Sequence, residues 1–309
     1  MFQVWKRSNV TTKVGSVNVG WLIDASVFYD SYEELAAAVT RQGHTVRLLN
    51  RPRPPYGWDD TDGAYRRAFP EGACVVTHAD IDLVHRIRAD EIWTPGAFAT
   101  PGHSDCTHYF SHFGRFLLNQ DYCMLPFGEL RRRADFLFDL FGRDGRIFVR
   151  PDSALKLFTG QVVSQESLER DLEHLAFYEF PVESLVVVSS AKSIEAEWRF
   201  IVARKTVVAG SQYKRGAEMA LSPDVPAGVR KFAEDVAASG YVPDPVWVMD
   251  ICRTKDGSDH LLEIGSFSFA NLYACDKDAV VRAVSEVAWD IHRDTKQSSD
   301  ATLRRTKSK

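Results

Sequence analysis

The sequence has little that would place it in several large protein classes. Neither GxxxxGK[ST] nor GxGxxG occurs in its 309 residues, which excludes a Walker-type phosphate loop and a dinucleotide-binding fingerprint. No apolar run reaches the ~18 residues that a membrane-spanning helix needs, and the first residues lack the apolar core of a secretory signal. The net charge of −4 gives no overall attraction to nucleic acid. We therefore expect neither a membrane nor a nucleic acid as partner.

Cysteine is also sparse and scattered. The five cysteines lie far apart along the chain and form no CxxC pair. This usage is typical of reduced thiols in a cytoplasmic protein and not of a disulfide framework. Nothing in the composition indicates an oligomeric state, which stays open.

The N-terminal part alternates strand and helix. Residues 17–23 form an apolar run, residues 32–42 have a helical pattern with acidic residues in the first turn, and Gly43 is the expected stop. The segments "ACVVT" and "DIDLVHRIRA" repeat this order of strand and helix. We predict a small parallel α/β domain over residues 1–115.

From Ile147 onward the pattern changes to strands separated by helices. We predict an α+β arrangement for this half of the chain. The end of the chain, residues 294–309, is polar, basic and almost free of apolar residues, so we expect it to be disordered.

Charged residues occur at the strands of this second half in an ordered way. Arg150 ends the strand "IFVR", and in "EAEWRFIV" the residues Glu197 and Arg199 share one face of a strand. The strands "VWVMDI" and "HLLEIG" carry Asp250 and Glu263, and the turn "TKDGSD" between them predicts a hairpin.

Two carboxylates on neighbouring apolar strands repel each other unless a cation compensates them. Oxygen ligands without clustered histidine or cysteine favour Mg²⁺ or Mn²⁺, which commonly takes its remaining ligands from phosphates and water. The nearby arginine and lysine residues suit the same phosphates. The pattern therefore predicts a nucleoside triphosphate site with a divalent ion.

The ordered set of motifs resembles the ATP-grasp superfamily. The segments that carry the resemblance are "IFVRPDSALKLFTGQVV", "EAEWRFIV" and "LLEIGSFSF", within residues 128–290. The likeness is closest to a compact clade of bacteria and phages in which arginine often replaces the usual strand lysine. It implies the ATP-grasp fold, in which two α+β lobes grip ATP, here over residues 116–190 and 191–293. The small parallel α/β domain precedes them.

The resemblance also implies roles for residues. Those expected at the phosphates lie on the strand, on a closing loop and on the second lobe: Arg150, Lys156, Phe158, Thr159, Gly160, Arg199, Lys214 or Arg215, and one of Arg131 to Arg133, of which we take Arg131. Those expected at adenine and ribose are Val187, Val188, Ser189 and Glu197. Asp250 and Glu263 match the two metal-binding acids.

One position departs from the family. Where its members commonly have Glu-x-Asn, this chain has Gly265, which offers no side-chain oxygen. Ser266, Ser268, Asn271 or water are the alternatives for that metal ligand, and of the side chains we favour Asn271.

The implied activity is that of an ATP-dependent carboxylate–amine ligase. Such an enzyme forms an acylphosphate and then an amide or peptide bond on an amino acid, a peptide or a related small acid. Its cofactors would be ATP and Mg²⁺ or Mn²⁺, and its partner a small-molecule or peptide substrate. The alternative is a non-catalytic module that binds nucleotide or a protein through the same fold.

A separate cluster, "GHSDCTHYFSH", contains histidines at positions 108 and 112. With Asp105, Cys106 or His103 it could form a zinc site and a hydrolase. The alternative is that His108 and Tyr109 lie near the cleft and face the acceptor substrate.

Several of these residues also have ordinary structural explanations when taken singly. Arg150 and Lys156 could be solvated surface charges, and Glu197 and Arg199 could pair only with each other across a sheet face. The order of the whole set favours the nucleotide site.

Overall fold

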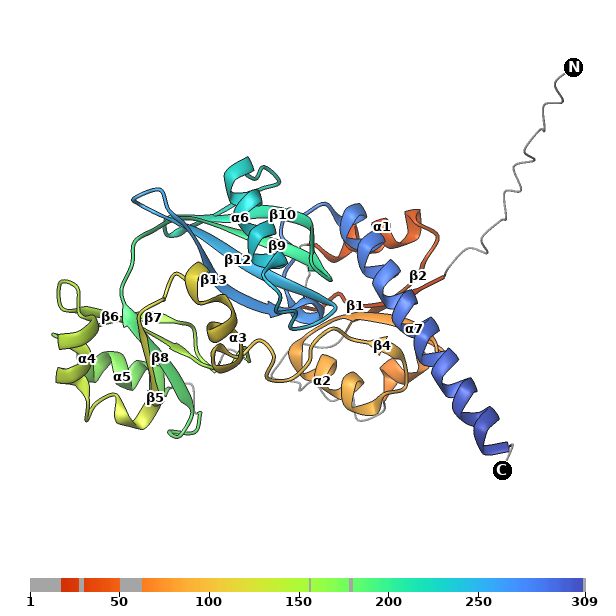
Figure 1. Ribbon diagram of the computed structural model, residues 1–309, viewed down its shortest axis with the longest axis horizontal. Coiled ribbons are helices and arrows are strands. Elements are labelled where there is room, and N and C mark those ends of the chain that lie inside the picture. The colour runs from red at the N-terminus through yellow and green to blue at the C-terminus, as the bar shows by residue number, and fades with distance from the viewer. Residues whose placement is uncertain (1–17, 28–30, 51–62, 156, 178–179, 308–309) are drawn as a thin grey trace, which may run out of the picture.

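A computed structural model of the protein describes residues 18–27, 31–50, 63–155, 157–177 and 180–307. Within these ranges the strands form three sheets, one parallel and two antiparallel. Figure 1 shows the parallel sheet at one end, the five-stranded sheet in the middle and the remaining sheet at the other end. No helix among the described residues is both long and apolar enough to cross a membrane.

The N-terminal sheet confirms the predicted parallel α/β layer. Its strand order is β2-β1-β3-β4, and every pair is parallel. The elements are β1 (Gly20–Asp24), α1 (Tyr32–Arg41), β2 (Thr45–Leu49), β3 (Cys74–His78), α2 (Ile81–Asp90) and β4 (Thr94–Gly96). Asp80 begins α2 by accepting hydrogen bonds from the backbone N–H groups of Asp82 and Leu83.

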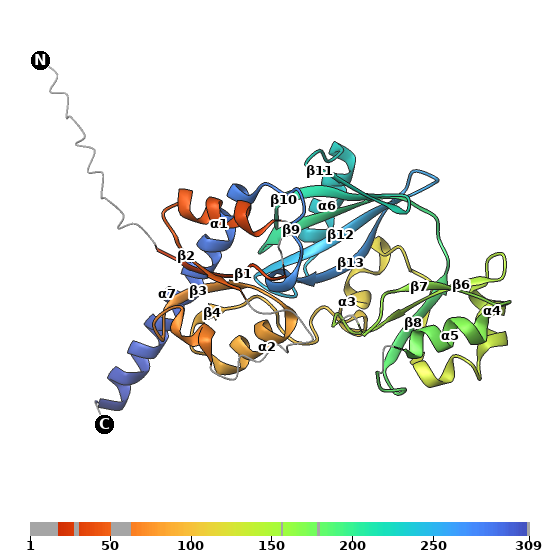
Figure 2. The ribbon, with the colours of Figure 1, turned by 180° about the vertical axis from the view of Figure 1, so that it is seen from behind.

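The second sheet is antiparallel, with strand order β5-β8-β6-β7. It consists of β5 (Tyr122–Pro126), β6 (Arg146–Pro151), β7 (Gln161–Ser164) and β8 (Leu185–Ser190), with α4 (Ala134–Phe141) and α5 (Leu168–Ala176) on it. Figure 2 shows the two helices beside this sheet, away from the rest of the molecule. Phe138, Val149, Phe158 and Leu175 are buried in the core between them.

The third sheet has the order β11-β10-β9-β12-β13 and is antiparallel. It consists of β9 (Ile194–Ala203), β10 (Thr206–Arg215), β11 (Glu218–Ser222), β12 (Val246–Thr254) and β13 (Asp259–Ser266). Apolar side chains of α3 (Cys106–Phe113) and α6 (Ala227–Ala238) share a core with it. The predicted hairpin is confirmed, since β12 and β13 pair with Asp250 opposite Glu263.

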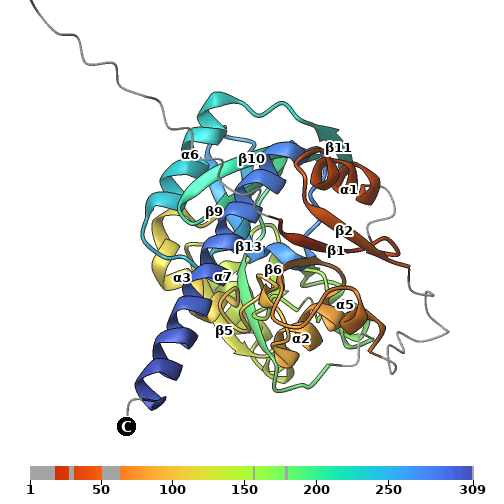
Figure 3. The same cartoon turned by 90° about the vertical axis from the view of Figure 1, so that its right-hand side faces the viewer.

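The end of the chain differs from our expectation. Helix α7 runs over Lys277–Lys307, so the segment expected to be disordered is helical through Lys307. This stretch contains no proline or glycine to end the helix, and the hydroxyls of Thr295 and Ser298 bond the carbonyl oxygens four residues earlier. The composition suggested disorder because the segment is almost free of apolar residues. The structure agrees that it packs on nothing, since the side chains of residues 293–299 are all exposed. Figure 3 shows the last turns of α7 extending beyond the body of the molecule.

Candidate functional site

A cavity of about 560 Å³ lies between the two antiparallel sheets. Strand β6 contributes Arg150 to its wall, and the loop after β6 contributes Thr159 and Gly160. The remaining polar lining comes mainly from the five-stranded sheet and the segment that follows it: Glu197, Arg199, Tyr213, Lys214, Asp250, Glu263, Ser266, Asn271 and Tyr273. Most of the charged residues that the sequence selected therefore face one space.

Each acid in this cavity has a basic partner. Arg199 holds Asp250 with two hydrogen bonds, from Nε to Oδ1 at 2.8 Å and from Nη2 to Oδ2 at 2.7 Å. Lys214 Nζ lies 3.0 Å from Glu197 Oε1. The third pair joins the two sheets, with Arg150 Nη2 on β6 lying 3.3 Å from Glu263 Oε2 on β13.

Burial determines the electrostatics of the Arg199–Asp250 pair. It raises the pKa of Asp250, which the Arg199 guanidinium offsets only in part. Burial also acts to lower the pKa of Arg199, but the charge of Asp250 and its hydrogen bonds outweigh this effect, and the pKa lies above its ordinary value. The two charges thus depend on each other inside the protein.

Two tyrosines complete the cluster, and sequence reasoning missed both. The Tyr213 hydroxyl donates to Glu197 Oε2 at 2.5 Å and also lies 3.3 Å from Asp250 Oδ2. Its ring stacks on Tyr273 with centroids 4.8 Å apart, and the Arg199 guanidinium lies 5.0 Å from the Tyr273 centroid. Burial raises the pKa of Tyr213 well above its ordinary range, so it remains a hydrogen-bond donor at neutral pH. The sequence contains one signal that could have identified Tyr213, namely its position directly before Lys214.

Comparison with known proteins agrees with this geometry. Residues 132–283 match a family model described as an ATP-grasp domain, family 2 of the clade that has arginine in place of lysine. This segment is an ATP-grasp domain. The resemblance inferred from the motifs, including the clade, is thereby confirmed. Members of this family are ATP-dependent ligases that bind ATP, usually with Mg²⁺.

Solved structures confirm the fold. D-cycloserine synthetase DcsG matches with a TM-score of 0.57 at 14% identity, over 88% of this chain and 99% of that one. D-alanine–D-alanine ligase from Bacillus anthracis, complexed with ATP, matches with a TM-score of 0.56 at 12% identity, over 91% and 100%. N5-carboxyaminoimidazole synthetase from Staphylococcus aureus gives 0.57 at 11% identity, over 87% and 77%. No curated protein matches the chain significantly.

Some of the expected ATP-grasp site residues lie elsewhere. Arg131 is exposed, pairs with Glu169 through a 3.0 Å hydrogen bond and does not line the cavity. Lys156 lies outside the described residues. The prediction for Lys156 therefore stays open, whereas Arg131 is not brought to this site.

The residues predicted to form the adenine hinge lie inside a sheet. Val187, Val188 and Ser189 lie in β8, which pairs with β5 on one side and with β6 on the other. Backbone groups of a strand with two neighbours are used in the sheet, so these residues do not offer them to a base. The connection from β8 to β9, residues 191–193, precedes Ile194, which does line the cavity.

Gly160 is the last residue of the loop before β7, and it packs closely against strand β6. A Cβ atom at this position would lie 2.8 Å from Phe148 Cζ and 3.0 Å from Arg150 Cβ. A larger residue would therefore push the loop away from the strand that carries Arg150.

The histidine segment does not form the zinc site that its spacing allowed. His103 donates to the carbonyl oxygen of Pro243 at 2.7 Å, and His112 stacks on Tyr241 with ring centroids 4.3 Å apart. Residues 103–112 are all described, and no group of three or more potential ligands there could hold a metal. His108 and Tyr109 do not line the cavity, and Tyr109 is fully buried.

The residues at the cavity fit a nucleotide with a divalent ion. No group of three His, Cys, Asp or Glu residues in the described chain could hold a metal, but Mg²⁺ commonly needs only one or two carboxylates when phosphates supply other oxygens. Glu263 and Asp250 both line the cavity, opposite each other on neighbouring strands. Arg150, Arg199 and Lys214 also line it, and their charges would suit bound phosphates.

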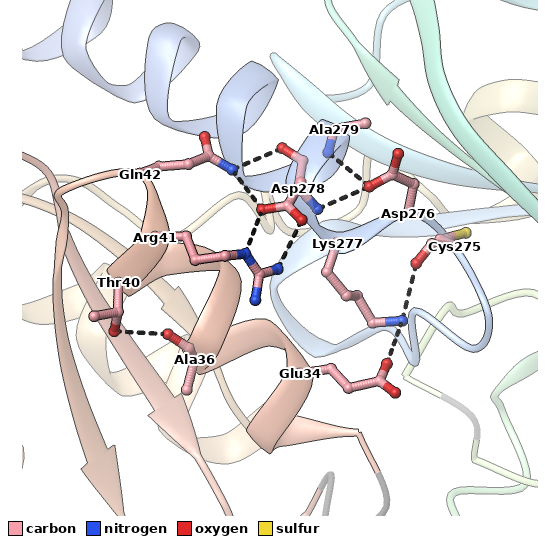
Figure 4. A network of polar contacts seen from close by, with 10 residues as sticks. All are labelled: Glu34, Ala36, Thr40, Arg41, Gln42, Cys275, Asp276, Lys277, Asp278 and Ala279. Atoms are coloured by element: carbon pink, nitrogen blue, oxygen red, sulfur yellow. Dashed lines mark hydrogen bonds and ion pairs between the residues drawn. The ribbon is translucent and has the colours of Figure 1, made fainter.

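The loop that carries Asn271 and Tyr273 is anchored behind the cavity. Figure 4 shows Lys277, at the start of α7, reaching back to this loop beside α1. Lys277 Nζ donates to the carbonyl oxygens of Tyr273 at 2.5 Å and Cys275 at 3.0 Å and lies 3.7 Å from Glu34. Asn271 in turn accepts a hydrogen bond from Arg199 through its carbonyl oxygen.

Replacing Lys277 by methionine should therefore loosen this loop. We expect the free energy of unfolding to fall by about 1–3 kcal/mol, because the carbonyl groups of Tyr273 and Cys275, one part-buried and one buried, lose their donor. We also expect weaker nucleotide binding, since Arg199 loses part of its support. Urea unfolding and nucleotide titration measure the two effects. The exposed lysine Lys231 on α6 provides the matched control, and a Lys277→Met variant that behaves like Lys231→Met would contradict this role.

Proposed function

We propose that the protein is an ATP-dependent carboxylate–amine ligase that acts on an amino acid, a peptide or a related small acid. The observation that carries the proposal is the cavity in which basic residues of both sheets face two adjacent carboxylates. The match to the ATP-grasp family supports it. The solved neighbours named as ligases or synthetases agree with it at the level of the fold.

In this proposal the residues that line the cavity have separate roles in binding the phosphates and the divalent ion. Arg150, Arg199 and Lys214 bind the phosphates of ATP and neutralise charge that develops during transfer. Thr159 and Gly160 lie on the loop after β6, which lines the cavity close to where the phosphates would bind. Asp250 and Glu263 are the two facing carboxylates at this site, and a divalent ion held there would supply further positive charge at the phosphates.

The reaction then has two steps. A substrate carboxylate oxygen bonds to the γ-phosphorus as the bond to ADP breaks, which gives an acylphosphate. An amine attacks the acyl carbon, inorganic phosphate leaves, and the nitrogen loses a proton to give the amide. Exclusion of water from the cavity would protect the acylphosphate from hydrolysis.

Trapping of the acylphosphate tests this proposal. The protein is incubated with ATP, Mg²⁺ and hydroxylamine, and with individual amino acids, short peptides and small acids. We expect a hydroxamate from one class of carboxylate, with equal release of ADP. A Glu263→Gln variant serves as the control and should form none.

The second candidate is a module that binds nucleotide without turnover. Two observations favour it: every acid of the cavity already has a basic partner, and Gly265 removes one ligand of the family. Tight nucleotide binding with no hydroxamate and no ADP from a broad set of acids would support this candidate over the ligase.

A further inference from the structure

The two carboxylates at the cavity lie opposite each other on β12 and β13 but in different surroundings. The Asp250 side chain is 2% exposed, and both of its oxygens accept from Arg199. Tyr213 contributes a further contact to Oδ2 at 3.3 Å. A metal ion at Asp250 would have to compete with a charge-assisted pair that is buried on both sides.

Glu263 is more open to the cavity. Its side chain is 31% exposed, and Arg150 Nη2 lies 3.3 Å from its Oε2. Arg150 lies on the other sheet, so phosphates that enter between the sheets can share its guanidinium with Glu263 without leaving a buried charge uncompensated. Glu263 can then turn to a cation brought in with the nucleotide.

Three side chains could replace the metal-binding asparagine that the family has at the position of Gly265, but they are already hydrogen-bonded or are poor ligands. Asn271 Oδ1 accepts from the backbone N–H of Tyr273 at 2.8 Å. The Ser268 hydroxyl is buried and accepts from the backbone N–H of Phe98 at 2.9 Å. Ser266 lines the cavity, but its neutral hydroxyl adds no negative charge to compensate a second ion.

On the assumption that the cavity binds ATP as proposed above, we infer that it holds one divalent ion, on Glu263, and that Asp250 is a positioning residue for Arg199. One carboxylate, phosphate oxygens and water form a sufficient ligand set for Mg²⁺. Asp250 fixes the guanidinium of Arg199 so that its remaining N–H groups and its charge face the phosphates. The division of roles follows from the different exposure of the two carboxylates and from the two-point pairing of Asp250 with Arg199.

Counting bound Mn²⁺ by electron paramagnetic resonance tests this inference on the intact protein, with a non-hydrolysable ATP analogue at saturation. We expect one Mn²⁺ per wild-type chain. Glu263→Gln should weaken Mn²⁺ binding at least about tenfold. Asp250→Asn should keep one Mn²⁺ per chain but weaken nucleotide binding roughly tenfold, to the same extent with and without Mn²⁺, since it disturbs Arg199 only.

The wild-type count requires no variant, so the test stands even if Asp250→Asn fails to fold. Two Mn²⁺ ions per wild-type chain, or the loss of Mn²⁺ from a folded Asp250→Asn variant, would overturn the inference while leaving the ligase proposal in place. A wild-type chain that binds no nucleotide would overturn the proposed function itself. Arg199→Lys offers a second check: it should weaken nucleotide binding and leave the Mn²⁺ count at one.

Discussion

Replacement of Arg150 by alanine is expected to reduce ATP turnover by about two to three orders of magnitude, the usual effect of removing one preorganised charge-stabilising group. Arg150 is held by strand β6 and its side chain is 12% exposed, so its guanidinium faces the cavity in a fixed position. No other described residue of β6 brings positive charge to that wall. Turnover is measured as ADP released with the acid identified by hydroxamate trapping.

Arg150→Lys is the matched control for this prediction. It keeps a cation at the strand end, where the wider family has lysine, and should retain most of the turnover. Both variants are checked for folding by circular dichroism. Wild-type turnover in a folded Arg150→Ala variant would show that the phosphates do not meet this strand.

Replacement of Asp250 by alanine is expected to lower the free energy of unfolding by about 3–5 kcal/mol. The reason is that Arg199 would remain buried with its charge uncompensated, since the two side chains are 8% and 2% exposed. Urea unfolding, with the midpoint and the slope both reported, measures the loss.

Two comparisons make this result specific. The double variant Arg199→Met, Asp250→Leu removes both charges and should recover most of the lost stability. Asp278→Ala breaks the exposed pair with Arg41 that Figure 4 shows and should have a much smaller effect. An Asp250→Ala variant no less stable than Asp278→Ala would contradict the account of the buried pair.

The strands of the site were predictable because their signals are local. Alternation by two places Glu197 and Arg199 on one face, and the Asp-Gly turn fixes β12 against β13 so that Asp250 meets Glu263. The order of these motifs was enough to indicate the fold of the two lobes and the family.

Contacts between segments that are distant in the chain could not be predicted from local sequence patterns. The pairing of Arg199 with Asp250, across 51 residues, depends on β9 lying beside β12, and the contact of Tyr213 with both acids depends on β10 lying on the other side of β9. An apolar run also does not reveal that β8, on which the adenine hinge is predicted, has neighbours on both sides. The helical end of α7 was missed because exposed polar residues form a helix as readily as a disordered tail when nothing breaks it.

The measurement that tests the central claim most directly is the shift in melting temperature on addition of ATP and Mg²⁺, for the wild type and for Glu263→Ala. A ligand at about 100 times its Kd stabilises the folded state by about 2.7 kcal/mol, a shift of a few degrees for a chain of this size. We predict a shift in the wild type that is larger with Mg²⁺ than with ATP alone, and we expect Glu263→Ala to lose this metal-dependent part of the shift. The absence of any shift in the wild type with ATP or another nucleoside triphosphate would contradict the account.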